Sequence, residues 1–424
     1  MDRISVLTDD LILKILSMIP TKVAVTTSVL SKRWCSLWKH VPQLSYSDPF
    51  GGCEFWRASR FVEKFLLLHE APVLDTLTLI LSRNCPPTDI STWISIAVSR
   101  GLRNLQLYMY GPCSTPIRLP RSLYTCQTLV SLILQNVVIV DVPLTICFGS
   151  LKTMYLERVD VSDDENFGRL LSGCTVLESL IVNFCSYDKT FTVDVPSLKS
   201  LLVLDLKPAS VQVPGDDDAG VVIKAPSLSS LMISDQFTWV CSLVDMPKLV
   251  NASIKLAHSY SKKLAGCLTS AKHLCLCVKS PVDSFLIGVF HQLVSLNLCT
   301  CTSHRFFLLL SHTPKLRVLR FQPQGNLPPD LNALERCCSS HGDFPTPSCV
   351  PECLISSLET VEWIDYRGTE AETKVVKYLF ENSQQLKKMA IRCLPSIDLA
   401  EKHKMLIDLA STQRSSSKCQ LSFT

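Results

Sequence analysis

The sequence lacks the features of a membrane or secreted protein. No segment is an unbroken apolar run of the about 18 residues that a transmembrane helix needs. The N-terminus has no basic region followed by an apolar core and a small-residue cleavage site, because Asp9, Asp10 and Lys14 interrupt it. We therefore expect a chain that stays in a reducing compartment, the cytoplasm or the nucleus, and has no membrane partner.

Catalytic signatures are also missing. The chain has no glycine-rich phosphate loop, no H-E-x-x-H and no G-x-S-x-G motif, and its 9 histidines are scattered. Charge is nearly balanced, with 42 basic and 38 acidic residues and a formal net charge of +4. That balance favours neither a nucleic-acid partner nor an anionic membrane. We expect a protein that is not an enzyme and that uses no cofactor.

Cysteine is abundant, with 20 in the chain. Outside an oxidising compartment they are not expected to form a disulfide framework. Most lie in apolar strand patterns, where a free thiol behaves as a small buried hydrophobe; examples are Cys185, Cys275, Cys277 and Cys299. The clusters Cys299-x-Cys301-x2-His304 and Cys337-Cys338-x2-His341 lack the paired C-x2-C spacing of zinc sites, so we expect no metal.

The first forty residues predict a compact unit of three short helices. Leu11, Ile12, Ile15, Leu16 and Ile19 recur at helical spacing and form one broad apolar stripe. A module this small cannot build a sufficient core alone, so it needs a partner surface. A helical lid on the next domain is the alternative.

Capping residues give the expected helix limits. Thr8 is expected to cap the first helix and Pro20 to end it. Thr21 is expected to cap a second helix that runs to about Leu30, and Ser31 a third. The third helix carries its apolar residues on one face, namely Trp34, Leu37 and Trp38.

Residues 2–38 closely resemble the F-box of plant F-box/LRR/FBD proteins. The resemblance rests on Asp2-Arg3-Ile4-Ser5, Leu7, Asp9, Leu11, Ile15-Leu16-Ser17, Pro20-Thr21-Lys22, Ala24-Val25, Thr27 to Trp34, and Leu37-Trp38. One departure is Thr8, where the family usually has a proline that presets the helix start. The resemblance implies a Skp-type adaptor as partner and, through it, a cullin.

The same resemblance suggests which residues contact the adaptor. They are Leu7, Leu11, Ile12, Leu16, Ile19, Pro20, Val29, Trp34 and Trp38. Some of them must instead form the small core of the module, and the sequence does not separate the two sets.

From about residue 70 the pattern L-x-x-L-x-L recurs. It starts at Leu74, Leu102, Leu129, Leu151, Leu177, Leu198, Leu228, Leu249, Ala271, Leu293, Leu316, Leu358 and Leu386. Most steps match the leucine-rich-repeat period, which predicts a stacked solenoid with a parallel sheet on its concave side. Longer steps leave room for a convex helix, as in the segment that begins DENFGRLL, whereas short ones allow only an extended or 3₁₀ return.

The outward positions of these strands are expected to line the concave face. The candidates for substrate binding are Tyr108, Tyr155, Glu157, Asn183 and Arg320. A mixed, partly aromatic surface suits a protein or peptide target, although a solvated face without a ligand is the simplest interpretation of any one position. Clustered cations on adjacent strands would favour a floor that binds a small ligand, and the sequence has only the scattered Lys199, Lys255, Arg317 and Arg320.

The C-terminal part resembles the FBD domain. The resemblance rests on Val350 to Leu354, Leu358-Glu359, Glu362-Trp363, Val376 to Leu379, Glu381-Asn382 and Leu386 to Met389. The pattern predicts strand–helix–strand, with Ala371, Val375, Val376, Leu379 and Phe380 on the inner helix face. We expect it to cap the open end of the array, with target recognition as the alternative.

These inferences give one architecture and one function. The fold class is α/β: a three-helix F-box, an irregular leucine-rich-repeat solenoid and a strand–helix–strand FBD cap. The expected divisions are 1–45 F-box, 46–72 connector helix, 73–322 solenoid, 323–350 proline-rich linker, 351–410 FBD domain and 411–424 frayed polar tail. By resemblance, the chain is the substrate-recognition subunit of a Skp–cullin–F-box ubiquitin ligase with an unknown target. A ligand-assisted receptor and an F-box scaffold outside ubiquitination are the alternatives.

Overall fold

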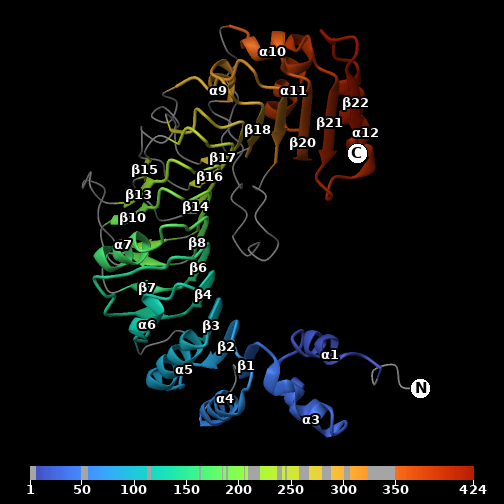
Figure 1. Ribbon diagram of the computed structural model, residues 1–424. Helices are drawn as coiled ribbons and strands as arrows, with labels where there is room; N and C mark the ends of the chain where they lie inside the picture. The colour runs from blue at the N-terminus through green and yellow to red at the C-terminus, as the bar shows by residue number, and fades with distance from the viewer. Residues whose placement is uncertain are drawn as a thin grey trace. The chain divides into compact units, whose positions relative to one another are not determined.

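The computed structural model comprises two compact units, which are described separately. One contains residues 1–198 and 206–212, and the other contains residues 199–205 and 213–424. The structure describes residues 6–48, 56–111, 116–161, 164–183, 185–187, 190–204, 206–208, 220–235, 241–243, 246–256, 267–278, 288–299, 306–322 and 349–424 (Figure 1). The predicted proline-rich linker therefore lies almost wholly outside the described residues.

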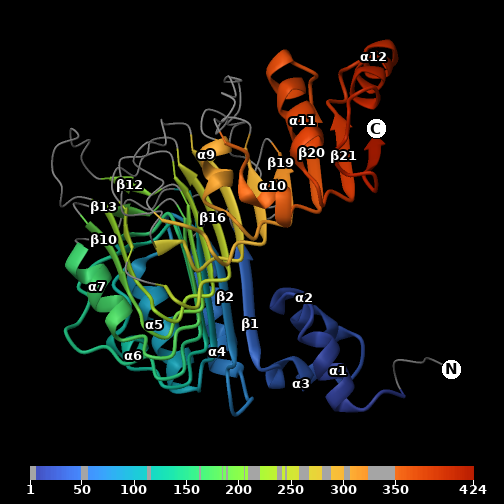
Figure 2. The ribbon, with the colours of Figure 1, turned by 90° about the horizontal axis from the view of Figure 1, so that it is seen from above.

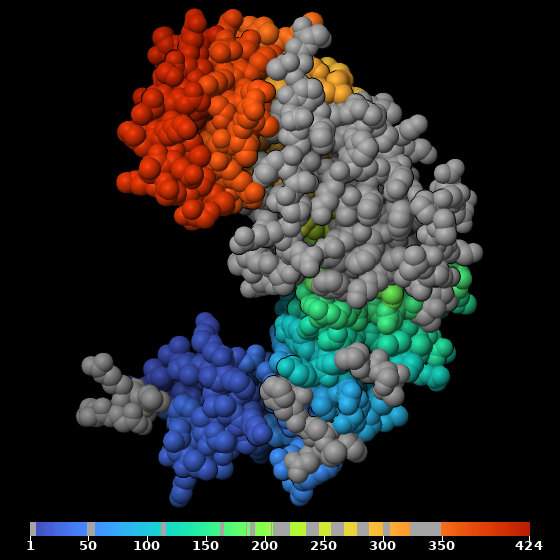
Figure 3. Space-filling view, turned by 180° about the vertical axis from the view of Figure 1, so that it is seen from behind, coloured from blue at the N-terminus to red at the C-terminus, as the bar shows by residue number. Residues whose placement is uncertain are grey.

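The first unit begins with the predicted helices, in shorter form. They are α1 (Asp9–Leu16), α2 (Thr21–Thr26), α3 (Trp34–Leu37) and the 3₁₀ turns η1 (Thr27–Val29) and η2 (Trp38–His40). Residues of this module form a continuous lobe beside the segment that follows them (Figure 3).

The expected caps are wrong in detail. Thr8 precedes α1, but its side chain makes no capping hydrogen bond. Thr21 is the first residue of α2 and is buried, and its hydroxyl accepts a hydrogen bond from the Ser45 amide at 2.7 Å. Arg33, not Ser31, directly precedes α3. A tertiary contact with Ser45 therefore engages the Thr21 hydroxyl that the sequence suggested as a local cap.

A parallel sheet follows, in the order β1-β2-β3-β4-β6-β8 in this unit. Its strands are β1 (Gln43–Asp48), β2 (Thr76–Ser82), β3 (Asn104–Tyr110), β4 (Ser131–Gln135), β6 (Thr153–Glu157) and β8 (Ser179–Asn183). Strand β1 lies where a connector was expected, and only α4 (Trp56–Leu68) fulfils the connector-helix prediction. Strand β1 has a weaker form of the L-x-x-L-x-L pattern, in which the three leucine positions are occupied by Val41, Leu44 and Tyr46.

Alternation along each strand builds the core. The register aligns Leu44, Leu77, Leu105, Leu132, Met154 and Leu180 in one buried row across the sheet. A second buried row contains Tyr46, Leu79, Leu107, Leu134, Leu156 and Val182. Successive strand residues point to opposite faces, so the residues between these rows form the other, open face of the sheet.

Helices and short extended pieces connect or flank the sheet strands of this unit. They are α5 (Pro87–Ser99), α6 (Arg121–Tyr124), α7 (Asp164–Ser172), β5 (Val138–Ile139), β7 (Asp160–Val161), β9 (Ser186–Tyr187), β10 (Thr190–Asp194) and β12 (Lys207–Pro208). Helix α7 confirms the helix expected in the DENFGRLL segment. Its Phe167 packs on Phe191 of β10, with ring centroids 4.5 Å apart.

The second unit continues the same architecture in the order β11-β14-β16-β17-β18-β19-β20-β21-β22, with parallel pairing throughout. The strands are β11 (Ser200–Leu204), β14 (Ser230–Asp235), β16 (Asn251–Leu256), β17 (His273–Val278), β18 (Ser295–Leu298), β19 (Val318–Phe321), β20 (Thr360–Tyr366), β21 (Lys388–Cys393) and β22 (Gln420–Phe423). The remaining elements are β13 (Gly220–Lys224), β15 (Cys241–Leu243), α9 (Phe306–Ser311), α10 (Glu352–Ser356), α11 (Glu370–Asn382) and α12 (Leu399–Ala410).

The C-terminal module is larger than strand–helix–strand. As predicted, Val375, Val376, Leu379 and Phe380 of α11 are buried, and α11 lies with α12 on one side of the strands (Figure 2). The frayed tail was a wrong expectation, because β22 pairs with β21. Arg414 lies over the Phe380 ring, 5.1 Å from its centroid, and Ser416 donates to the Leu386 carbonyl at 2.7 Å. The module extends the sheet, and β22 is its last strand.

Cysteines behave mostly as expected. Cys185 and Cys277 are buried free thiols, and burial raises the pKa of Cys185 to about 12, which keeps it protonated. Cys299 is disulfide-bonded, which corrects the expectation of a free thiol there.

No group of three metal-ligating side chains occurs among the described residues, and the remaining members of the two Cys/His clusters lie outside them. No helix in the described ranges is long and apolar enough to cross a membrane.

Candidate adaptor interface and open sheet face

The F-box fold separates the predicted adaptor residues into two sets. Ile12 and Leu16 on α1 are 0% and 1% exposed, and Trp34 and Trp38 are also buried. These four form the interior of the module with Ala24 and Leu37. They can influence adaptor binding only by maintaining the fold.

The remaining predicted contacts are accessible. Leu11, Pro20 and Val29 are exposed, and Leu7 and Ile19 are half-buried. Further exposed apolar side chains, which were absent from the predicted set of contacts, extend this surface: Val6, Ile15, Met18, Val23 and Leu30. Val29 is 86% and Met18 78% exposed, an unfavourable state for large apolar groups unless a partner covers them.

Arg33 connects the start of the third helix to the start of the first. Its guanidinium lies 2.6 Å from the Asp9 carboxylate and also donates to the Leu7 carbonyl. The Asp9 side chain is 59% exposed, so the ion pair orients the segment more than it stabilises it. This contact tethers the residues on either side of Thr8, at the entry to α1.

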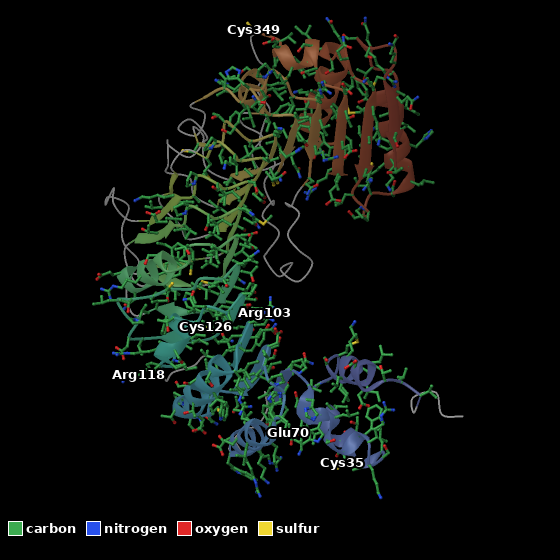
Figure 4. All side chains as sticks on the ribbon, viewed as in Figure 1. Cys35, Glu70, Arg103, Arg118, Cys126 and Cys349 are labelled. Carbon is green, nitrogen blue, oxygen red and sulfur yellow. The ribbon has the colours of Figure 1, made fainter. Side chains whose placement is uncertain are left out.

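A dense joint attaches the F-box to the first strand and helix of the array. Lys39 lies 2.8 Å from the Glu70 carboxylate (Glu70 is labelled in Figure 4), and the Lys39 carbonyl accepts the Glu70 and Ala71 amides. The Gln43 amide donates to the Ser17 carbonyl. Because these contacts combine with the Thr21–Ser45 bond, the module and the array share one compact unit.

His69 is the buried polar centre of this joint. Arg100 donates to its Nδ1 at 3.2 Å, so Nε2 carries the proton and donates to the Val41 carbonyl at 2.9 Å. Burial lowers the pKa of His69, and the nearby charge of Arg100 lowers it further. The residue was not singled out from the sequence, because its partners are contributed by other elements.

The open face of the first unit is almost uncharged. Its three rows are Gln43, Thr76, Asn104, Ser131, Thr153, Ser179; Ser45, Thr78, Gln106, Ile133, Tyr155, Ile181; and Ser47, Ile80, Tyr108, Gln135, Glu157, Asn183. Glu157 is the charged residue among these described positions. Such a surface offers many hydrogen-bonding groups and little electrostatic selectivity.

Four of the five predicted substrate-binding residues come together here. Tyr108, Glu157 and Asn183 lie in one register row, and Tyr155 is in the adjacent row. The Tyr155 hydroxyl donates to Glu157 Oε2 at 2.6 Å, and burial together with this contact raises the Tyr155 pKa. Asn183 is only 2% exposed, contrary to its expected outward position.

The fifth candidate, Arg320, belongs to the second unit. Its Nε lies 2.7 Å from Glu362 Oε2 on the neighbouring strand β20. Lys388 on β21 approaches the other oxygen of the same carboxylate at 3.8 Å. The sequence predicted only scattered cations on this face, because Lys388 lies in the segment that was interpreted as a cap.

Comparisons with known proteins give the family. The F-box domain model matches residues 4–45, the repeat model of the FBD-associated F-box protein At5g56370 matches 90–259, and the FBD model matches 346–391. Arabidopsis thaliana At5g56440, whose name places it among the FBD-associated F-box proteins, is 58% identical over 100% of both chains. The Arabidopsis F-box/FBD/LRR-repeat protein At5g56420 is 38% identical over 100% of this chain and 99% of its own. The chain therefore belongs to the plant family of FBD-associated F-box proteins with leucine-rich repeats.

Proposed function

We propose that this protein is the substrate-recognition subunit of a Skp–cullin–F-box ubiquitin ligase. The F-box would bind a Skp-type adaptor and, through it, a cullin, and the repeat array would bind a target protein. The subunit would act by proximity, since it would hold the target near a conjugating enzyme and supply no bond-making group. The proposed location is the cytoplasm or the nucleus.

The exposed apolar surface of the F-box is the observation that carries this proposal. Leu11, Met18 and Val29 project from a module whose own interior is already filled by Ile12 and Leu16. A partner that covers these side chains removes their apolar surface from water, and this burial stabilises the complex. The joint at Lys39 and Glu70 would transmit the adaptor's position to the array.

Charged substitutions at exposed positions test the proposal without disturbing the core. The double variant Leu11→Asp/Val29→Asp should recover at least about tenfold less adaptor and cullin from plant cells, because apolar interface anchors contribute about 2 kcal/mol each. Leu144→Asp is the matched control, since Leu144 is 83% exposed and lies outside the F-box.

The composition of the purified complex decides between the alternatives. Adaptor together with cullin supports a ligase, whereas adaptor without cullin supports a scaffold outside ubiquitination. Undiminished recovery of adaptor by the double variant would contradict the assignment of the interface to the exposed set.

A further inference from the structure

The open face of β19–β21 differs from the rest of the sheet in carrying several cations. We call Arg320, Lys388 and Arg392 the basic face; their register partners on β20 are Glu362, Thr360 and Ile364. All three cations are solvent-accessible, with Arg320 43% and Lys388 54% exposed as side chains. Glu362 is the acidic side chain that pairs with two of them, Arg320 and Lys388.

The acidic charge at this face is insufficient to neutralise the cations. Glu362 contacts Arg320 at 2.7 Å and Lys388 at 3.8 Å, so one carboxylate is shared by two cations. Arg392 has no carboxylate within ion-pair distance among the residues that the structure describes. The basic face and Glu362 together therefore retain a net positive charge.

The fold itself does not require these charges. Strand positions in register with Arg320 hold Asn297 on β18 and Cys275 on β17, and those in register with Lys388 hold Val318 and Ser295. These neutral side chains occupy the same rows of the same sheet. The cations are therefore explained better by recognition than by packing.

The geometry favours an extended acidic segment over a compact anion. Lys388 and Arg392 are four residues apart on one strand, which separates their Cα atoms by about 13 Å. An extended chain with spaced carboxylates can reach both cations at once. Glu362 lies between Arg320 and Lys388, so a phosphate dianion bound between these two cations would be repelled by the Glu362 carboxylate. The separate carboxylates of an extended peptide can instead contact the cations on either side of Glu362.

We propose that the basic face binds an extended segment rich in Asp and Glu in the target protein. The proposal rests on the target-binding role proposed above and assigns a recognition surface to the C-terminal module, which was expected to act mainly as a cap.

Fluorescence anisotropy with the full-length chain tests this directly. The probe is a short fluorescein-labelled peptide of alternating Glu and Ser, and the comparison peptide has Gln in place of Glu. Lys388→Gln/Arg392→Gln should bind the acidic probe about tenfold more weakly, roughly threefold for each exposed ion pair lost. Lys374→Gln/Lys404→Gln, on α11 and α12, removes the same charge elsewhere in the module and should bind as the unmodified protein does.

A second variant changes the affinity in the opposite direction. Glu362→Gln frees Arg320 and Lys388 and should tighten binding of the acidic probe by about threefold. A purely structural role of Glu362 would not produce tighter binding. Thermal unfolding of each variant establishes that the fold is retained.

Three results would overturn the proposal. They are equal binding of the Glu and Gln peptides, unchanged binding by Lys388→Gln/Arg392→Gln, and stronger binding of a single-phosphoserine peptide than of the Glu peptide. None of these measurements involves the adaptor. Failure of the peptide to bind would therefore leave the proposed ligase function untouched. Failure of the adaptor to bind would not affect the interpretation of the peptide measurements.

Discussion

Leu11 and Leu16 lie on the same helix and were assigned the same role from the sequence, but substitution by alanine should separate them. Leu16 is 1% exposed and Leu11 is 48% exposed. Truncating a fully buried leucine costs about 2–5 kcal/mol, because transfer free energy is lost and a cavity remains. An exposed leucine has little burial to lose, so its truncation should change stability by less than about 0.5 kcal/mol.

Hydrogen exchange of the α1 amides, measured by mass spectrometry, reads out this local difference. A loss of about 3 kcal/mol speeds exchange through local opening by about 150-fold in Leu16→Ala, against about twofold in Leu11→Ala. Adaptor recovery should fall in both variants, but in Leu11→Ala it should fall without faster exchange. Equal exchange in the two variants would refute the separation of interior from interface.

The joint and the C-terminal strand give two further predictions. His69 has a pKa below its usual value, so the unfolded chain takes up a proton near pH 6.5 that the folded joint resists; the stability contributed by neutral His69 is present above pH 6.5 and is lost as pH falls. Between pH 7.5 and pH 5.5 the melting temperature of His69→Gln should therefore fall by less than that of the unmodified protein. Equal falls in the two proteins would show that His69 is not the source of this pH dependence. Removal of residues 412–424 deletes β22 and should lower the unfolding free energy of the C-terminal module by about 2 kcal/mol or more, whereas loss of a frayed tail would leave a thermal melt unchanged.

Repeat periodicity was the most readable feature of the sequence. All thirteen predicted repeat starts are followed two residues later by a strand, from Leu74 before β2 to Leu386 before β21. Each strand buries its own leucines against its neighbours, so the pattern is recorded locally in every repeat. Strands β1 and β22 were missed because their patterns begin with Val41 and Lys418, which depart from the leading leucine.

Helix caps were less predictable than strands. Thr21 and Ser31 have the residue types of N-caps, but the Thr21 hydroxyl accepts its hydrogen bond from Ser45. A capping residue is recognised by what its side chain can bind, and the partner available to Thr21 lies on a strand 24 residues further along the chain. Local propensity could not show that competition.

The sequence by itself determined the order of modules, the strand-forming segments and the resemblance that assigns the family, because periodicity and motif residues are local properties of the chain. Only the tertiary structure decided which apolar F-box residues are interior and which are exposed. It also placed Glu362 within reach of both Arg320 and Lys388 and ordered the C-terminal residues as a strand. The physical reason is the same in each case: burial, ion pairing and sheet pairing depend on atoms contributed by distant parts of the chain, and these are specified only when the strands stack in register.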